Sequence, residues 1–227
     1  MTTTLEQLRA GQLAGARHLK LACGLTEFPR EIFDLADTLE TLDLSGNALS
    51  TLPDDLPRLH RLRILFASDN RFTELPDVLG ACPQLSMIGF KANRIRTVSA
   101  RSLPPQLRWL ILTDNAIDTL PAELGHCSQL QKLMLAGNRL HALPETMAAC
   151  SRLELVRLSS NRLNALPAWL LRLPDWRGSR TPATRSARHG KQPRRPTRRS
   201  PRFNGHRLCS NSRSAKARRA SFIGRGG

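Results

Sequence analysis

The sequence predicts an α/β fold, a right-handed solenoid of about seven coils with a parallel sheet, followed by a disordered C-terminal tail. The solenoid is predicted by asparagines that recur every 22 or 23 residues: Asn47, Asn70, Asn93, Asn115, Asn138 and Asn161. Each lies in one apolar frame, LxxLxLxxNxLxxLPxxLxxLxx, as in LETLDLSGNALSTLP and LQKLMLAGNRLHALP. The tail is predicted by charge, because 16 of the 35 Lys and Arg residues, but one of the 18 acidic residues, follow Pro174.

Residues 1–18 are expected to form an N-terminal capping helix. Leu5 and Leu8 are three residues apart, so they lie on one helix face and can pack against the first coil. A frayed end is the alternative.

Residues 19–174 are expected to form the solenoid. In each LxxLxL segment two apolar residues, such as Leu42 and Leu44, point to one side of a short strand. The asparagine follows at the turn, where its amide can bond backbone groups that have left the ladder. The proline of the frame suits the start of a short helical or 3₁₀ return, which needs no N–H there. Stacked coils then bury a continuous core, worth roughly 1.5–3 kcal/mol per leucine.

These units resemble the leucine-rich repeat family from about Leu19 to Leu173. A shortened first unit, LKLACGLTEFP, places Cys23 where the asparagine would stand. The resemblance implies that the strands line a concave surface, with the x positions of LxxLxLxx facing solvent.

The middle coils carry large apolar residues at these solvent-facing positions. They are Ile64, Phe66, Met87, Trp109, Ile111 and Met134. The rim is charged, with Arg63, Lys91, Arg108, Lys132 and Arg157 besides Asp69, Asp114 and Glu154. Apolar patches rimmed by charge usually mark interaction sites, so we predict that these residues bind a protein partner. The alternatives are that the side chains lie on one another and shield the sheet, or that the solenoid self-associates.

No catalytic, cofactor or metal site is predicted, so the chain is not expected to be an enzyme. Three cysteines fall at one packed position of the frame and are predicted to be buried thiols: Cys82, Cys127 and Cys150. The histidines share no register and are expected on turns and the convex side: His18, His60, His126 and His141. No signal peptide or long apolar run is present, so a cytoplasmic protein without a membrane span is expected.

Residues 175–227 are rich in Arg, Ser, Pro and Gly and are expected to be disordered. Two explanations compete for this tail. It is either a functional basic arm that binds nucleic acid or an anionic surface electrostatically, or the product of a reading-frame shift near Pro174.

The genetic code favours the frameshift. With one base restored after Pro174, the codons permit LPRLAWLAYAGNPF, an eighth repeat whose asparagine falls at Thr184. The segment Ser214 to Ile223 permits FGKGASGVIY, which resembles the Gly-rich loop of protein kinases. We therefore predict that the parent gene encodes a bacterial-type leucine-rich repeat protein kinase, of which this chain keeps the docking or sensor part. Loss of the eighth coil is then expected to expose an edge formed by Leu163, Leu166, Trp169 and Leu170.

Overall fold

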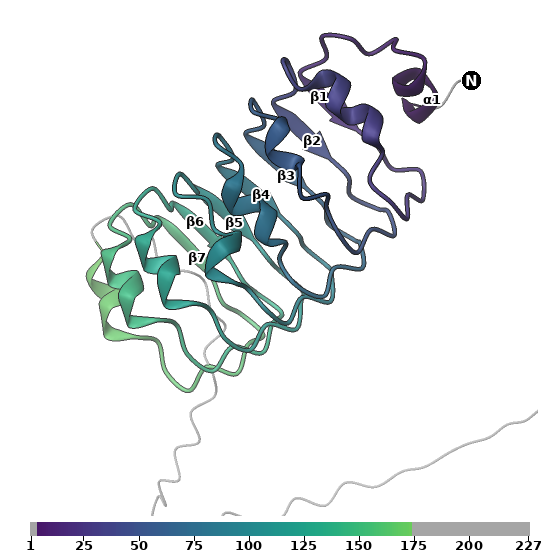
Figure 1. Cartoon of the computed structure of the whole chain (residues 1–227). Helices are drawn as coiled ribbons and strands as arrows, with labels where there is room; N and C mark the ends of the chain where they lie inside the picture. The colour runs from purple at the N-terminus through teal and green to yellow at the C-terminus, as the bar shows by residue number, and fades with distance from the viewer. Residues whose placement is uncertain (1–3, 174–227) are drawn as a thin grey trace, which may run out of the picture. The chain divides into compact units, whose positions relative to one another are not determined.

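The computed structural model describes residues 4–173, and these residues form the predicted solenoid (Figure 1). Seven strands make one parallel sheet in the order in which they occur along the chain. The strands are β1 (His18–Lys20), β2 (Thr41–Asp43), β3 (Ile64–Phe66), β4 (Met87–Gly89), β5 (Trp109–Ile111), β6 (Lys132–Met134) and β7 (Leu155–Arg157). Each strand therefore belongs to one coil, and we number the coils after their strands.

The return segments are short 3₁₀ helices. They are η1 (Arg30–Leu35), η2 (Leu56–Arg58), η3 (Asp77–Ala81), η4 (Ala100–Ser102), η5 (Ala122–His126), η6 (Glu145–Ala149) and η7 (Ala168–Arg172). A proline directly precedes five of them, as predicted from the frame, whereas Asp54 and Asp55 separate Pro53 from η2. Coil 4 has Ser99 at this place instead, and its hydroxyl accepts a hydrogen bond from the N–H of Arg101 (3.1 Å). A side chain thus replaces proline at the start of η4.

The repeated asparagines tie neighbouring coils together. The Nδ2 amide of Asn138 donates to the carbonyl oxygens of Leu112 (2.8 Å) and Leu135 (3.0 Å), one coil apart. Its Oδ1 accepts from the N–H of Ile117 (3.0 Å) in the preceding coil. The same pattern recurs at Asn47, Asn70, Asn93, Asn115 and Asn161. The asparagine is therefore an inter-coil connector as well as a turn residue.

The residue before each asparagine has a left-handed backbone. Its φ is 74° at Gly46, 53° at Asp69, 52° at Ala92, 56° at Asp114, 71° at Gly137 and 56° at Ser160. Glycine adopts this conformation without steric cost, whereas other residues lose roughly 1–2 kcal/mol. Four of these six coils have a residue other than glycine at this position. They accept the cost because the asparagine that follows must bond backbone groups of its own coil and of the preceding one.

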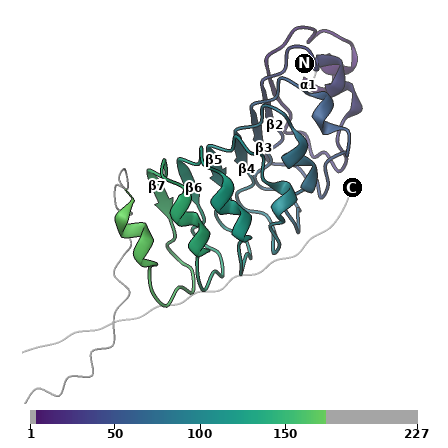
Figure 2. The ribbon, with the colours of Figure 1, turned by 60° about the vertical axis from the view of Figure 1, so that its left-hand side comes forward.

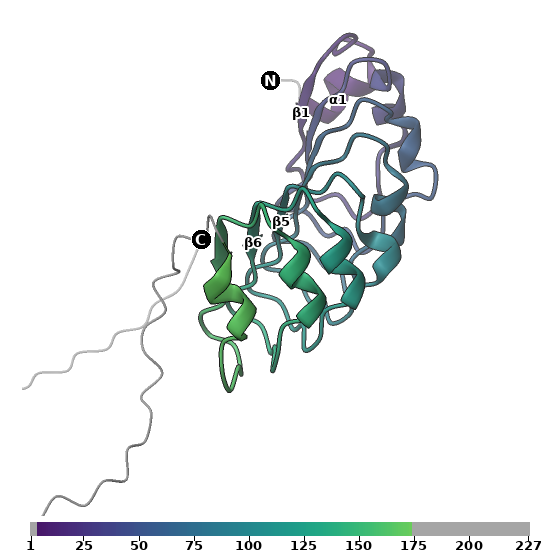
Figure 3. The ribbon, with the colours of Figure 1, turned by 90° about the vertical axis from the view of Figure 1, so that its left-hand side faces the viewer.

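The core lies between the sheet and the 3₁₀ helices. The central residue of every strand is buried, whereas the first and third residues lie on the opposite face of the sheet. Figure 2 shows the return segments stacked along one side of the coils, and Figure 3 shows the strands on the inner side of the arc that the coils follow. We call the face formed by the first and third strand residues the concave face.

The two ends of the described coils differ. At the N-terminal end, α1 (Thr4–Arg9) buries Leu8, and Arg9 contacts Glu31 of η1 at 3.1 Å. At the other end, the predicted exposure of the last coil is wrong for Trp169 and Leu170. Both are buried, because η7 turns them toward the core, and Leu163 is half-buried. Among the large apolar side chains of residues 4–173, only Leu166 (39%) and Leu171 (65%) are exposed.

The predicted tail and the eighth coil lie outside the described residues, and the domain boundaries stay predictions. Among residues 4–173, no helix has the length and apolar character required to cross a bilayer.

Candidate functional site

The strand register brings the predicted recognition residues together in two rows on the concave face. Ile64, Met87 and Trp109 are paired in order across β3, β4 and β5. In the second row Phe66 faces Gly89, which faces Ile111, which in turn faces Met134. Strands of a sheet lie about 4.8 Å apart, so the six apolar side chains form one continuous surface.

These apolar residues are half-buried rather than fully open. The ring of Phe66 lies over Gly89, where an added Cβ would come within 2.5 Å of the ring. The ammonium group of Lys132 lies 3.7 Å from the centroid of the Trp109 ring, a cation–π contact. Lys132 is thus part of the surface rather than only of its rim. The alternative that these side chains lie on one another and shield the sheet is therefore correct in part for Phe66 and Trp109, although both rings still contact solvent.

The charged rim is divided between the two edges of the sheet. Arg63 and Arg108 precede strands β3 and β5, and both are exposed. Lys91 and Asp114 follow strands β4 and β5 and form an ion pair of 3.9 Å. Arg157 ends β7, where it pairs in register with Met134. Five of the predicted rim residues therefore lie beside the apolar rows: Arg63, Lys91, Arg108, Asp114 and Arg157.

A hollow that the sequence does not predict opens at the edge where the strands begin. It has a volume of about 310 Å³, and Ile64, Met87 and Trp109 line it together with Arg63 and Arg108. His18 also lines it: predicted on a turn or the convex side, His18 instead lies in β1 on the concave face. A second hollow, of about 430 Å³, adjoins it and shares the Arg63 side chain.

The thiol groups of the three predicted core cysteines are buried. Cys82, Cys127 and Cys150 are at most 3% exposed, which confirms the prediction of packed thiols. Burial raises the pKa of the Cys82 thiol to about 12 and the pKa values of the other two to about 11. Among residues 4–173, no group of three or more His, Cys, Asp or Glu side chains is placed to hold a metal ion.

A charged cluster on the convex side joins coils 1 and 2. Asp55 accepts hydrogen bonds from both Nη atoms of Arg30 (2.7 and 2.6 Å) and from Arg58 (3.2 Å). These hydrogen bonds hold the pKa of Asp55 below its ordinary value. Both guanidinium groups also lie 4.6 Å from the ring centroid of Phe33. The cluster is internally paired, so we assign it to coil stacking rather than to recognition.

Two stretches of the chain match family models for the leucine-rich repeat, residues 38–59 and 105–163. Among curated proteins, the chain is similar to human PH domain leucine-rich repeat-containing protein phosphatase 1, with 31% identity over 108 residues. The match covers 45% of this chain and 6% of that protein. The chain thus spans a small part of the length of this relative.

Solved structures show the same coils. A leucine-rich repeat protein of Leptospira interrogans matches with a TM-score of 0.68 and 29% identity, over 74% of this chain and 43% of that one. The plant peptide hormone receptor RGFR1 in complex with RGF2 matches with a TM-score of 0.58 and 29% identity. That match covers 65% of this chain and 24% of the receptor.

Proposed function

Since this chain is a leucine-rich repeat protein, we propose that it recognises another protein through the concave face of its coils. The observation that carries the proposal is the pair of apolar rows on strands β3 to β6, bordered by basic residues. Trp, Met and Arg are enriched at the centres of protein interfaces, because they contribute much contact area. The similarity to a plant peptide hormone receptor solved in complex with RGF2 supports recognition of another molecule by a chain of this fold.

A substitution in one strand tests the proposal. Trp109→Asp is expected to leave the coils folded, because the indole is half-buried on the concave face, and to abolish partner binding. Leu110→Asp in the same strand is the matched control, and it is expected to unfold the protein because Leu110 is fully buried. Circular dichroism checks the fold of both variants.

Partner binding is measured in the cells that make the protein, with a photo-crosslinking amino acid at position 87. The same amino acid at position 123, on η5 of the convex side, is the control. The proposal requires a crosslinked protein that depends on position 87 and disappears with Trp109→Asp. Equal crosslinking from both positions would refute recognition by the concave face.

We also infer that the solenoid is the docking or sensor part of a truncated repeat kinase. The support is the reading-frame argument, in which an eighth repeat and a Gly-rich loop are both permitted beyond Pro174. The nucleotide sequence of the gene tests it. An uninterrupted repeat and kinase in the alternate frame would support the inference, and scattered stop codons in that frame would favour a functional basic arm.

A further inference from the structure

The edge of the concave face where the strands begin holds arginines without acidic partners. Among the described residues, the side chains of Arg61 and Arg63 make no ion pair or hydrogen bond, and Arg108 bonds only the neutral amide oxygen of Gln131 (3.2 Å). The one carboxylate in the two hollows, Glu40, already faces Arg17 at 3.4 Å. The guanidinium donors at this edge are therefore available to an incoming molecule.

The opposite edge of the face has the opposite character. Asp69 and Asp114 follow strands β3 and β5, and the single lysine there, Lys91, is paired with Asp114. Next to strands β3 to β5, the unpaired positive charge thus lies at the edge where the strands begin, although Arg71 and Arg94 add positive charge further along the opposite flank. Between the edges lies the apolar floor of Ile64, Met87 and Trp109.

From this arrangement we propose that the partner of the concave face is a protein that presents an acidic segment around a large apolar side chain. The apolar side chain enters the 310 Å³ hollow, and carboxylates on either side of it bond Arg63 and Arg108. This inference rests on the proposed function and specifies the chemistry of its partner.

The spacing of the two arginines limits which segments fit. Arg63 and Arg108 precede strands β3 and β5, which are separated only by β4. Two steps of about 4.8 Å put their backbones roughly 10 Å apart, which is about three residues of extended chain. Ser86, between them, has a small side chain that donates to the Arg63 carbonyl (3.3 Å) and leaves the hollow open. Two acidic residues about three positions apart, with the apolar residue between them, satisfy this geometry.

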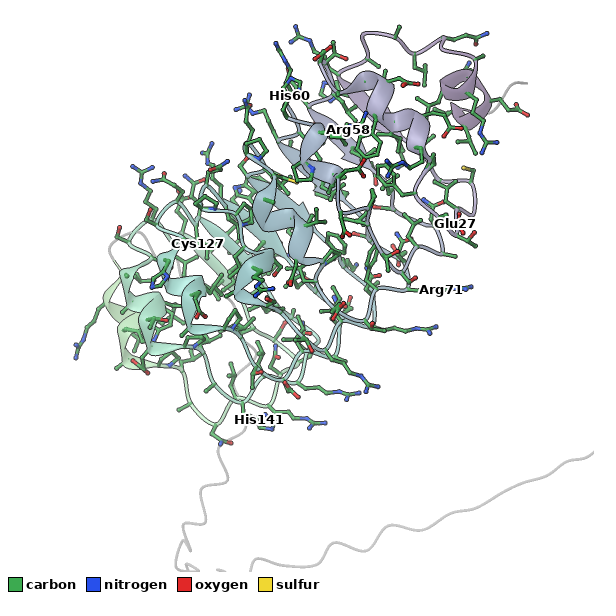
Figure 4. All side chains as sticks on the ribbon, viewed as in Figure 1. Glu27, Arg58, His60, Arg71, Cys127 and His141 are labelled. Atoms are coloured by element: carbon green, nitrogen blue, oxygen red, sulfur yellow. The ribbon has the colours of Figure 1, made fainter. Side chains whose placement is uncertain are left out.

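The test is a selection of random twelve-residue peptides on phage against the full chain. The library is first depleted on Trp109→Asp, which keeps the basic residues after Pro174 and so removes peptides that bind them. Binding of the selected peptides is then compared between the parent protein and Arg63→Gln/Arg108→Gln. Arg71→Gln/Arg94→Gln is the control with the same loss of charge. Neither of these side chains has an ion pair or hydrogen bond among the described residues, and Figure 4 shows Arg71 on the flank opposite His60.

Binding is then located by NMR from the indole N–H signals of the full chain. A selected peptide should shift the Trp109 signal and leave that of buried Trp169, in the last coil, unchanged. The inference is supported by peptides that carry two acidic residues around an apolar one and meet two conditions. Arg63→Gln/Arg108→Gln must bind them about tenfold or more weakly than the parent protein does, and the control variant must bind them as tightly as the parent protein. Peptides that shift Trp109 without acidic residues overturn the acidic partner but leave the proposed function intact. Absence of any peptide that shifts Trp109 overturns both.

Discussion

Asn138 offers the most direct test of how the coils are held together. Asn138→Ala removes three hydrogen bonds from a side chain that is 6% exposed. The carbonyl oxygens of Leu112 and Leu135 each keep the amide of a neighbouring asparagine, at 3.1 and 2.8 Å. The N–H of buried Ile117 loses its partner, and no other hydrogen bond joins it to a described residue. The three lost hydrogen bonds are therefore expected to cost different amounts of free energy.

The orphaned Ile117 N–H dominates the expected cost. A buried donor without a partner costs roughly 1–3 kcal/mol. A lost hydrogen bond costs less where the acceptor keeps another donor, as the Leu112 and Leu135 carbonyls do. The free energy of unfolding should therefore fall by about 2–4 kcal/mol. Asn47→Ala is the matched control, because its Oδ1 accepts from the N–H groups of exposed Cys23 and half-buried Leu25. Water can replace that acceptor, so about 1 kcal/mol is expected there.

Urea unfolding followed by circular dichroism measures both variants. Hydrogen exchange at the Ile117 amide adds a local measurement, because this amide should exchange faster in Asn138→Ala than in the parent protein. Equal destabilisation by the two substitutions, or unchanged protection of Ile117, would refute the role of the asparagines as inter-coil connectors.

Three further predictions concern stability and reactivity. Gly137→Ala should lower Tm in thermal unfolding more than Gly46→Ala does. Both glycines have φ above 70°, but a Cβ at position 137 would lie 2.3 Å from Oδ1 of Asp114, whereas a Cβ at position 46 would contact nothing. The hydrogen bond from Arg30 lowers the pKa of Asp55, so the stabilising effect of the Asp55 carboxylate is present at neutral pH and is lost as the pH falls below about 4. Asp55→Asn should therefore lower Tm at about pH 7 and make Tm depend less on pH in the acidic range. The three buried cysteines should resist iodoacetamide, as read by peptide mass spectrometry, until the protein is unfolded.

Most of the fold could be predicted from the sequence because each coil repeats the same physical requirement. A buried residue at the centre of each strand and an asparagine at each turn appear as a fixed spacing, and the observed register of β1 to β7 follows that spacing. The left-handed residue before each asparagine was not predictable by type, since glycine, aspartate, alanine and serine all occur there. Only a pattern of φ angles, which the sequence does not contain, reveals the shared conformation.

The candidate site was predictable in its membership but not in its shape. The period-two rule identifies which strand residues face away from the core, so the rows containing Phe66 and Trp109 follow from the repeat alone. How these side chains settle depends on their neighbours. The absent side chain at Gly89 lets the Phe66 ring lie down, and the Lys132 ammonium covers part of the Trp109 ring. Pairwise packing of this kind has no periodic signal, and neither has the hollow that it leaves.

The same sheet shows that its apolar rows are not needed to form it. Strands β1 and β2 carry polar or charged residues at the equivalent concave positions, where Lys20 and Asp43 form an ion pair of 3.2 Å. Their register with β3 is nevertheless the same as that among the central strands. A sheet that tolerates His18 and Thr41 at its end does not require Ile64 and Trp109 at its centre. Shielding of the sheet thus leaves the apolar centre unexplained, whereas the proposed contact with a partner would account for its composition.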